Sequence, residues 1–191
     1  MEAIALDLSP FIKLTDEQFF QLCQNHRDYR FERTALGELI IMPPTGGETG
    51  KSNFELSVQL GIWNKQNNLG VAFDSSTAFK LPNGADRSPD ASWVRKERWD
   101  ALTPKQREKF PPLCPDFVVE LRSPSDSLKT LREKMQEYMD NQARLGWLLD
   151  RPNKRVEIYR QGRDVEILES PTTLSGEDVL PGFVLDLSEI F

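Results

Sequence analysis

The stretch from Phe117 to Leu121 reads FVVEL and is the most strand-like run of the chain. Pro115 precedes this run and the turn-forming triplet Ser123-Pro124-Ser125 follows it, so both of its ends are marked. A short run of apolar and β-branched residues between such signals is typical of a buried strand. We therefore predict that residues 117–121 form a central strand of a sheet.

The sequence predicts one long helix on each side of this strand. The first runs from about 50 to 67, where apolar residues recur at helical spacing before Gly70. The second starts after a cap at residue 126 or 127, runs to about 144 and is ended by Gly146. We expect these helices to flank the sheet.

Short strands complete the pattern between and after these helices. They are indicated at residues 71–74, 77–81, 90–94 and 147–149. From residue 50 to 150, the order is then helix, strand, strand or hairpin, strand, helix and strand. This order is not a pure alternation of strands and helices, and it predicts an α/β fold with a mixed central sheet.

Two further segments flank this core. Before it, a helix with a capping box at Thr15 and a two-stranded hairpin are expected. After it, strands at 155–159 and 165–168 lead into an irregular tail. A chain of 191 residues has the length of one domain. We predict a single domain over residues 1–191, with the core at about 50–150, the N-terminal helix and hairpin at 15–42, and a C-terminal β extension with an acidic tail at 155–191.

The net charge of −6 is unevenly distributed along the chain. Residues 164–191 contain seven acidic residues and no lysine or arginine, whereas the whole chain has 24 basic and 30 acidic residues. Residues 1–163 therefore carry 24 basic and 23 acidic residues and are close to neutral. Binding of phosphate groups by this part of the chain is compatible with its charge, although the charge of the whole chain argues against it.

Histidine and cysteine are too scarce to build a metal site. His26 is the only histidine, and Cys23 and Cys114 are the only cysteines. This excludes a disulfide framework and a zinc site, so oxygen ligands must hold any metal ion. No basic residue precedes Lys13, and no apolar run approaches the ~18 residues of a membrane span. We expect a cytoplasmic protein without a membrane segment.

Glu120 stands inside the apolar run, where a charged side chain is costly. Burying a carboxylate alone costs on the order of several kcal/mol, so Glu120 must either form an ion pair, with Arg122 or Lys134, or hold a metal ion. Asp90 opens a predicted strand thirty residues earlier. Two adjacent strands carrying Asp90 and Glu120 would offer two hard oxygen ligands to Mg²⁺.

Several short motifs occur in a characteristic order along the chain. They are SPD at 88–90, CPDFVVE at 114–120, SPS at 123–125, KMQEY at 134–138, GWLLD at 146–150 and VEIY at 156–159. The matching region spans roughly residues 30–165, about two thirds of the chain. This ordered set resembles the PD-(D/E)xK nuclease superfamily, and more closely a bacterial family of restriction-endonuclease-like proteins.

The resemblance implies a core of order α-β-β-β-α-β and a divalent cation, Mg²⁺ or Mn²⁺, as cofactor. It implies that Asp90 and Glu120 are the metal ligands and that Glu55, on the first core helix, completes the site. A strict motif has lysine two residues after Glu120, where this chain has Arg122. In the family, the lysine comes from the following helix, and Lys134 occupies that position here. Arg122 would then contact phosphate or pair with Glu120.

These assignments imply a Mg-dependent endonuclease that hydrolyses DNA phosphodiester bonds. In this hypothesis the metal ion polarises the phosphate and activates a water molecule, while Lys134 orients that water or offsets charge in the transition state. Basic residues between 87 and 109 are candidates for DNA contacts, or else they form a solvated basic face. They are Arg87, Arg95, Lys96, Arg98, Lys105, Arg107 and Lys109.

Two other hypotheses remain open. Residues 46–52 (GGETGKS) follow a strand and precede a helix as a P-loop does, but Gly46 and Gly50 enclose three residues where that motif needs four. Nucleotide binding is therefore the weaker alternative. The stronger one is a non-catalytic module that binds DNA or protein on a nuclease-like fold. The strands at 156–159 and 165–168 offer an edge through which a homodimer would form.

Overall fold

A mixed six-stranded sheet forms the centre of the protein. Its strands are β4 (Gly70–Asp74), β7 (Ala91–Arg95), β8 (Phe117–Arg122), β9 (Leu145–Asp150), β10 (Arg155–Arg160) and β11 (Glu166–Glu169). The computed structural model describes residues 3–8 and 11–191 and gives the strand order β11-β10-β9-β8-β7-β4. β8 lies between β7 and β9, so the FVVEL run forms a central strand, as predicted.

The connections within this sheet confirm the predicted fold class. β8 and β9 are parallel and are joined by the helix α5 (Leu128–Asp140), whereas the other neighbouring strands pair antiparallel. The helix α2 (Gly47–Asn67) precedes β4. The order α2-β4-β7-β8-α5-β9 is therefore the α-β-β-β-α-β order of a restriction-endonuclease-like core.

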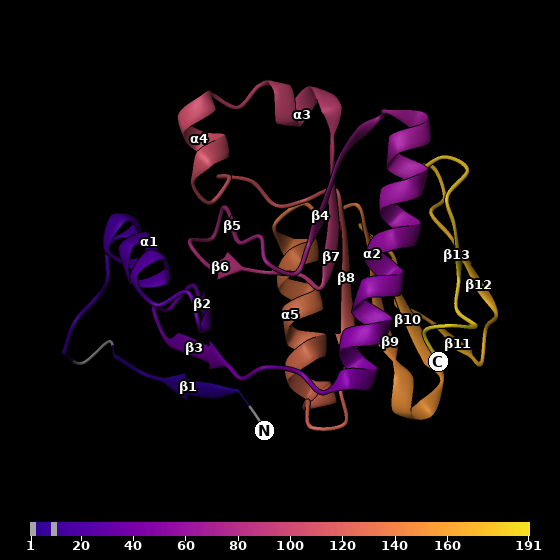
Figure 1. The fold of residues 1–191 in the computed structure, drawn as a ribbon, viewed down its shortest axis with the longest axis horizontal. Coiled ribbons are helices and arrows are strands. Elements are labelled where there is room, and N and C mark those ends of the chain that lie inside the picture. Colours follow the sequence, from indigo (N-terminus) through magenta and orange to yellow (C-terminus); the bar gives the residue numbers. More distant parts are fainter. Residues whose placement is uncertain (1–2, 9–10) are drawn as a thin grey trace.

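The two helices cover opposite faces of the sheet (Figure 1). Each face has its own hydrophobic core. On one face, Leu56 and Leu60 of α2 pack with alternate residues of β8. On the other face, Met135 and Tyr138 of α5 pack with Val118. Successive side chains of a strand point to opposite faces, so Glu120 shares the face of Val118 and points toward α5.

The end of α5 differs from the prediction. The helix ends at Asp140 rather than near residue 144, and Gly146 is a residue of β9. A Cβ atom at position 146 would lie 2.5 Å from Met135 Cε and 3.3 Å from Val118 Cγ2. A side chain at this position would therefore displace the end of the Met135 side chain, and glycine lets α5 pack over β8 and β9 without that shift.

A second sheet lies on the α5 side of the central sheet (Figure 1). Its strands are β1 (Ile4–Leu6), β2 (Arg30–Arg33), β3 (Leu39–Met42), β5 (Phe79–Lys80) and β6 (Asp86–Arg87), in the order β1-β3-β2-β6-β5. The helix α1 (Asp16–Asn25), with its capping box at Thr15, and the β2–β3 hairpin are as predicted. β1 and β6 were not predicted, because strands of two or three residues are too short to show a period. β5 is likewise shorter than the strand predicted at 77–81.

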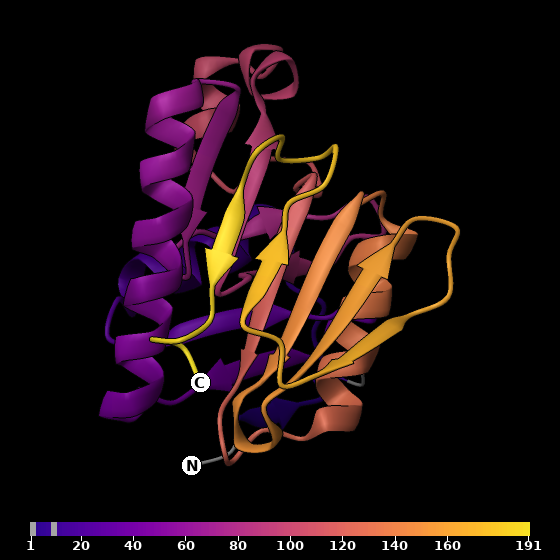
Figure 2. The same ribbon diagram turned by 90° about the vertical axis from the view of Figure 1, so that its right-hand side faces the viewer.

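The C-terminal tail is ordered and belongs to the core on the α2 side. It contains a small hairpin of β12 (Thr173–Ser175) and β13 (Val184–Asp186), which lies over the central sheet in Figure 2. Leu180, Phe183 and Leu185 of this tail are fully or almost fully buried against α2 and the sheet. The two strands of this hairpin were not predicted, because three-residue strands among proline and glycine carry no clear local signal.

Short helical elements complete the chain. They are α3 (Lys96–Asp100), α4 (Pro104–Glu108) and the 3-10 turn η1 (Arg151–Asn153). α4 follows the Thr103-Pro104 pair as expected and has a capping box at Thr103. No helix in the described part of the chain is long and apolar enough to span a bilayer.

Candidate active site

A cleft of about 1180 Å³ opens where the second sheet faces the ends of β8, α2 and α5. It is lined by Asp90 and Glu120, by residues of β2 and β3, and by the first turns of both long helices. Eight acidic and four basic residues line it. The acidic ones are Glu32, Glu38, Glu48, Asp90, Glu120, Asp126, Glu133 and Glu137, and the basic ones are Arg30, Arg87, Lys134 and Arg151. The cleft is therefore suited to attract cations.

Asp90 and Glu120 lie side by side at the floor of this cleft. β7 and β8 are antiparallel neighbours in which Ala91 pairs with Val119, and the same register places Asp90 opposite Glu120. Asp90 Oδ2 accepts a 2.8 Å hydrogen bond from the backbone N–H of Leu121, and Oδ1 accepts one of 3.2 Å from Asn53 Nδ2. Burial raises the pKa of Asp90, although the hydrogen bond from Leu121 acts to lower it. The strand pairing thus brings together the two carboxylates that the sequence singled out.

Glu120 is almost entirely buried, with 4% of its surface exposed. Its Oε1 accepts a 2.9 Å hydrogen bond from Tyr138 and lies 2.9 Å from Lys134 Nζ. Burial raises the pKa of Glu120 to about 7, because the charge of Lys134 only partly offsets desolvation and the nearby negative charges. Both contacts engage Oε1, so Oε2 is the oxygen available to a ligand in the cleft.

Lys134 projects from α5 and contacts two carboxylates of the cleft, those of Glu32 and Glu120. Its Nζ lies 2.8 Å from Glu32 and 2.9 Å from Glu120. Burial disfavours its charge, but the two carboxylates outweigh this effect and raise the pKa of Lys134, so it stays protonated. The ion pair between Glu120 and Lys134 is one of the two pairings expected from the sequence.

A buried network missed by the sequence reasoning surrounds this lysine. Glu32 of β2 accepts hydrogen bonds from Lys134, from the N–H of Ser88 and from Arg87. Arg87 Nε in turn donates a 2.5 Å hydrogen bond to Glu137. Burial acts to raise the pKa of Glu32, but Lys134 and Arg87 lower it below its ordinary value. The RFER sequence of β2 resembles an exposed strand, and its only local signal was a carboxylate between apolar and basic neighbours.

The charges of this floor do not balance. Four carboxylates, those of Glu32, Asp90, Glu120 and Glu137, face three cationic side chains, those of Arg30, Arg87 and Lys134. Within the described residues, no three Asp, Glu, His or Cys side chains converge tightly enough to hold a metal by themselves. Mg²⁺, however, commonly uses one or two carboxylates and completes its shell with water and substrate phosphate. Asp90 and Glu120 fit this pattern.

Arg122 and Glu55, the other two predicted site residues, are not brought to the cleft. Arg122 Nη1 lies 2.9 Å from the buried Asp150, because the parallel register of β8 and β9 sets these residues opposite each other. Glu55 accepts a hydrogen bond from Gln59 and lies outside the lining of the cleft. Two residues of a helix span about 200°, so Asn53, not Glu55, is on the side of α2 that reaches Asp90.

The predicted DNA-contact stretch is also mostly elsewhere. Of its seven basic residues only Arg87 lines the cleft, and it is paired there with two carboxylates. α3 and α4 lie at the opposite end of the central sheet from the β8–α5 loop (Figure 1). Basic side chains of this stretch are paired with acidic residues there, such as Arg98 with Asp116 and Lys109 with Glu17. Six of the seven predicted contact residues therefore lie outside the cleft.

The P-loop-like segment does not form a phosphate-binding loop. Residues 47–52 are the first turns of α2 instead of a loop. Lys51 pairs with Glu189, and Ser52 Oγ donates to the backbone carbonyl of Ile190. The residues that would hold a nucleotide therefore anchor the C-terminal segment.

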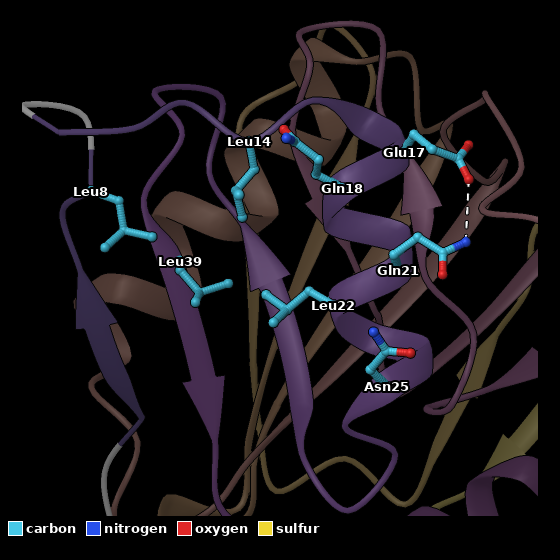
Figure 3. Close-up of a pocket in the computed structure, with 8 residues that line it drawn as sticks. All are labelled: Leu8, Leu14, Glu17, Gln18, Gln21, Leu22, Asn25 and Leu39. Atoms are coloured by element: carbon cyan, nitrogen blue, oxygen red, sulfur yellow. Dashed lines mark hydrogen bonds between the residues drawn. The ribbon is translucent and has the colours of Figure 1, made fainter.

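A smaller hollow of about 480 Å³ lies between α1 and the edge of the second sheet (Figure 3). Leu22 from α1 and Leu39 from β3 line it, and Glu17 is the one charged residue on its rim. Glu17 accepts a hydrogen bond from Gln21 and pairs with Lys109. This hollow lacks the convergent charges of the larger cleft, which is therefore the candidate site.

Comparisons with known proteins agree with this fold. A crystal structure described as "a putative nuclease belonging to DUF820", from Anabaena variabilis, superimposes with a TM-score of 0.76 and 18% sequence identity, over 93% of this chain and 97% of that chain. At this identity the likeness speaks for the fold alone. No curated protein matches the chain. The family described as "Uma2: Putative restriction endonuclease" matches residues 16–188, and the chain therefore belongs to the Uma2 family.

Proposed function

We propose that this protein is an endonuclease that hydrolyses DNA phosphodiester bonds with Mg²⁺ or Mn²⁺. The observation that carries the proposal is the pairing of Asp90 with Glu120 at the floor of a cleft whose linked carboxylates outnumber its cations. A divalent cation would offset the excess negative charge of this floor. Membership of a family described as restriction endonucleases and a nuclease-like fold support the same activity.

The roles of the residues follow from their contacts. Asp90 and Glu120 would hold the cation, Glu120 through the oxygen that Lys134 and Tyr138 do not engage. A bound divalent cation supplies Lewis-acid stabilisation of the phosphate and activates the attacking water. Lys134, kept protonated by its two carboxylate partners, offers a positive charge beside the scissile phosphate. Tyr138 fixes the orientation of Glu120.

The charge of the cleft makes DNA binding dependent on the cation. Phosphates are repelled by the acidic excess of the cleft. Three of its four basic side chains already pair with its own carboxylates, namely Arg87, Lys134 and Arg151. Binding of a divalent cation reduces this repulsion at the point of cleavage. We therefore expect DNA to bind more weakly in EDTA than in Mn²⁺, by about tenfold or more.

Plasmid cleavage tests the proposal. The wild-type protein is expected to nick or linearise supercoiled DNA with Mg²⁺ or Mn²⁺ but not with EDTA. Asp90→Asn and Glu120→Gln preserve shape and remove the ligand charge, so each should reduce the rate by about a hundredfold or more. Glu55→Gln is a matched control, because Glu55 lies outside the cleft, and its rate should equal that of the wild type.

Each outcome of this experiment separates the candidate functions. Cleavage that survives both Asp90→Asn and Glu120→Gln would refute the assignment of the site. Metal-independent DNA binding without cleavage under any condition would favour a non-catalytic binding module on the same fold.

A further inference from the structure

The ammonium group of Lys134 is shared between two carboxylates from different parts of the chain. Its Nζ lies 2.8 Å from Glu32 Oε1 and 2.9 Å from Glu120 Oε1. Only 12% of the Lys134 side chain is exposed. Water therefore cannot easily replace either partner, and the position of the ammonium depends on both carboxylates.

The carboxylate of Glu32 is held on both of its oxygens. Oε1 also accepts a 2.9 Å hydrogen bond from the N–H of Ser88, and Oε2 lies 3.1 Å from Arg87 Nη1. Arg87 is fixed in turn by Glu137, whose other oxygen accepts a hydrogen bond from Asn83. Glu32 is thus a preorganised acceptor that cannot turn away from Lys134.

The carboxylate of Glu120 is held on one side only. Lys134 and Tyr138 both contact its Oε1. A cation on Oε2 would have the same sign of charge as Lys134 and would weaken the ion pair between Lys134 and Glu120. A lysine with no other partner would then oppose the cation or leave the cleft.

From this geometry we infer that Glu32 is a positioning residue: it keeps Lys134 in the cleft and takes up its charge when a divalent cation binds at Glu120, so that the lysine opposes the cation less and the cation binds more tightly. The inference rests on the proposed function, because it assumes a cation at Asp90 and Glu120. It assigns a role in the site to the N-terminal hairpin, since Glu32 lies in β2, outside the α-β-β-β-α-β core. Glu32 and Lys134 are 102 residues apart in sequence.

A double-mutant cycle on Mn²⁺ affinity tests the inference without relying on cleavage. Dissociation constants would be measured by electron paramagnetic resonance of free Mn²⁺ for the wild type, Glu32→Gln, Lys134→Met and the double variant. Glu32→Gln is expected to weaken binding about tenfold, as other residues that orient a metal site do. In the Lys134→Met background the same substitution should cost about twofold or less. An equal loss in both backgrounds would overturn the inference, because a general charge effect needs no lysine.

Two further variants separate position from charge. Glu32→Asp keeps the negative charge but shortens the side chain and withdraws it from Lys134, so it should also weaken Mn²⁺ binding. Wild-type affinity in this variant would overturn the inference. Glu38→Gln removes a carboxylate from the same wall of the cleft. Glu38 itself forms no ion pair with Lys134 in the described part of the chain, so the Mn²⁺ affinity of this variant should stay within about twofold of the wild type. A tenfold loss in Glu38→Gln would point to charge alone.

The same titrations distinguish this inference from the proposed function. Circular dichroism would confirm that each variant is folded. If Glu32→Gln does not fold, the Mn²⁺ affinities of Glu32→Asp and Glu38→Gln test the inference in its place. If the wild type binds Mn²⁺ and Asp90→Asn does not, the metal site is supported. If Glu32→Gln then costs the same affinity with and without Lys134, only the role of Glu32 is overturned. A wild-type protein that binds no Mn²⁺ overturns both proposals.

Discussion

Asp90 accepts a 2.8 Å hydrogen bond from the backbone N–H of Leu121, the residue that follows Glu120. This bond ties the residue before β7 to the strand that carries the second carboxylate, and it fixes the position of one proposed metal ligand relative to the other. Asp90 therefore has a structural contact in addition to its proposed role as a ligand.

We predict that Asp90→Ala lowers the free energy of unfolding by about 1–3 kcal/mol in addition to abolishing cleavage, because it leaves the Leu121 N–H without its acceptor. Asp90→Asn keeps an oxygen acceptor and should lose activity with a smaller loss of stability. Urea denaturation of both variants without metal measures the difference. Equal stability of Asp90→Ala and the wild type would show that this hydrogen bond contributes nothing.

The pKa of Glu120 predicts a dependence of stability on pH. Burial raises this pKa from 4.5 to about 7, so between these pH values the folded state binds more protons than the unfolded state. Stability contributed by the protonated carboxyl group is present below pH 4.5 and is lost as the pH rises through about 7, at up to roughly 1.4 kcal/mol per pH unit.

The side chain introduced by Glu120→Gln cannot titrate, so this variant should not show the loss of stability with rising pH. Relative to the wild type, the variant should therefore become more stable as the pH increases from 4.5 to 7, when unfolding is measured by urea denaturation in EDTA. A stability difference that does not change over this range would contradict the raised pKa.

Asn53 is predicted to support the cation site from α2. Its Nδ2 donates to Asp90 Oδ1, while its Oδ1 is buried without a hydrogen-bond partner in the described part of the chain. Asn53→Ala should weaken Mn²⁺ binding by about tenfold, because it removes the group that orients Asp90. Asn67→Ala, at the other end of the same helix, is the control and should leave the affinity unchanged. Identical affinities for the two variants would exclude a role of Asn53.

The C-terminal tail should be indispensable for folding. We propose that residues 1–191 unfold as one unit, because Leu180, Phe183, Leu185, Leu187 and Ile190 are buried in the core that also contains α2. Burial of each such side chain contributes about 1.5–3 kcal/mol, so deleting residues 177–191 removes roughly as much as the whole stability of a typical domain.

Thermal denaturation followed by circular dichroism measures this effect. The truncated chain should show no cooperative transition, whereas Asp178→Asn, which removes only an exposed partner of Arg144, should cost less than about 1 kcal/mol. A cooperative transition in the truncated chain would show that the tail is a separate unit.

Local patterns were sufficient to predict the core. The central place of β8, the two long helices and the N-terminal hairpin follow from apolar runs, helical spacing and turn residues, which act over a few neighbouring positions. The carboxylates Asp90 and Glu120 were found because a charge beside or within an apolar strand is unusual at any position. The strands β1, β6, β12 and β13 were missed, because pairing with distant segments, not local composition, makes them strands.

The sequence by itself therefore determined the order of the elements and the two carboxylates that mark the cleft. Only the tertiary structure decided their partners. In it, Lys134 pairs with Glu120 and with Glu32. Arg122 pairs with Asp150, and Glu55 contacts Gln59 outside the cleft. The physical reason is that periodicity states which face of an element is buried but not which element covers it. The charged contacts of the site join segments up to about a hundred residues apart, and they form only when the second sheet packs on α5.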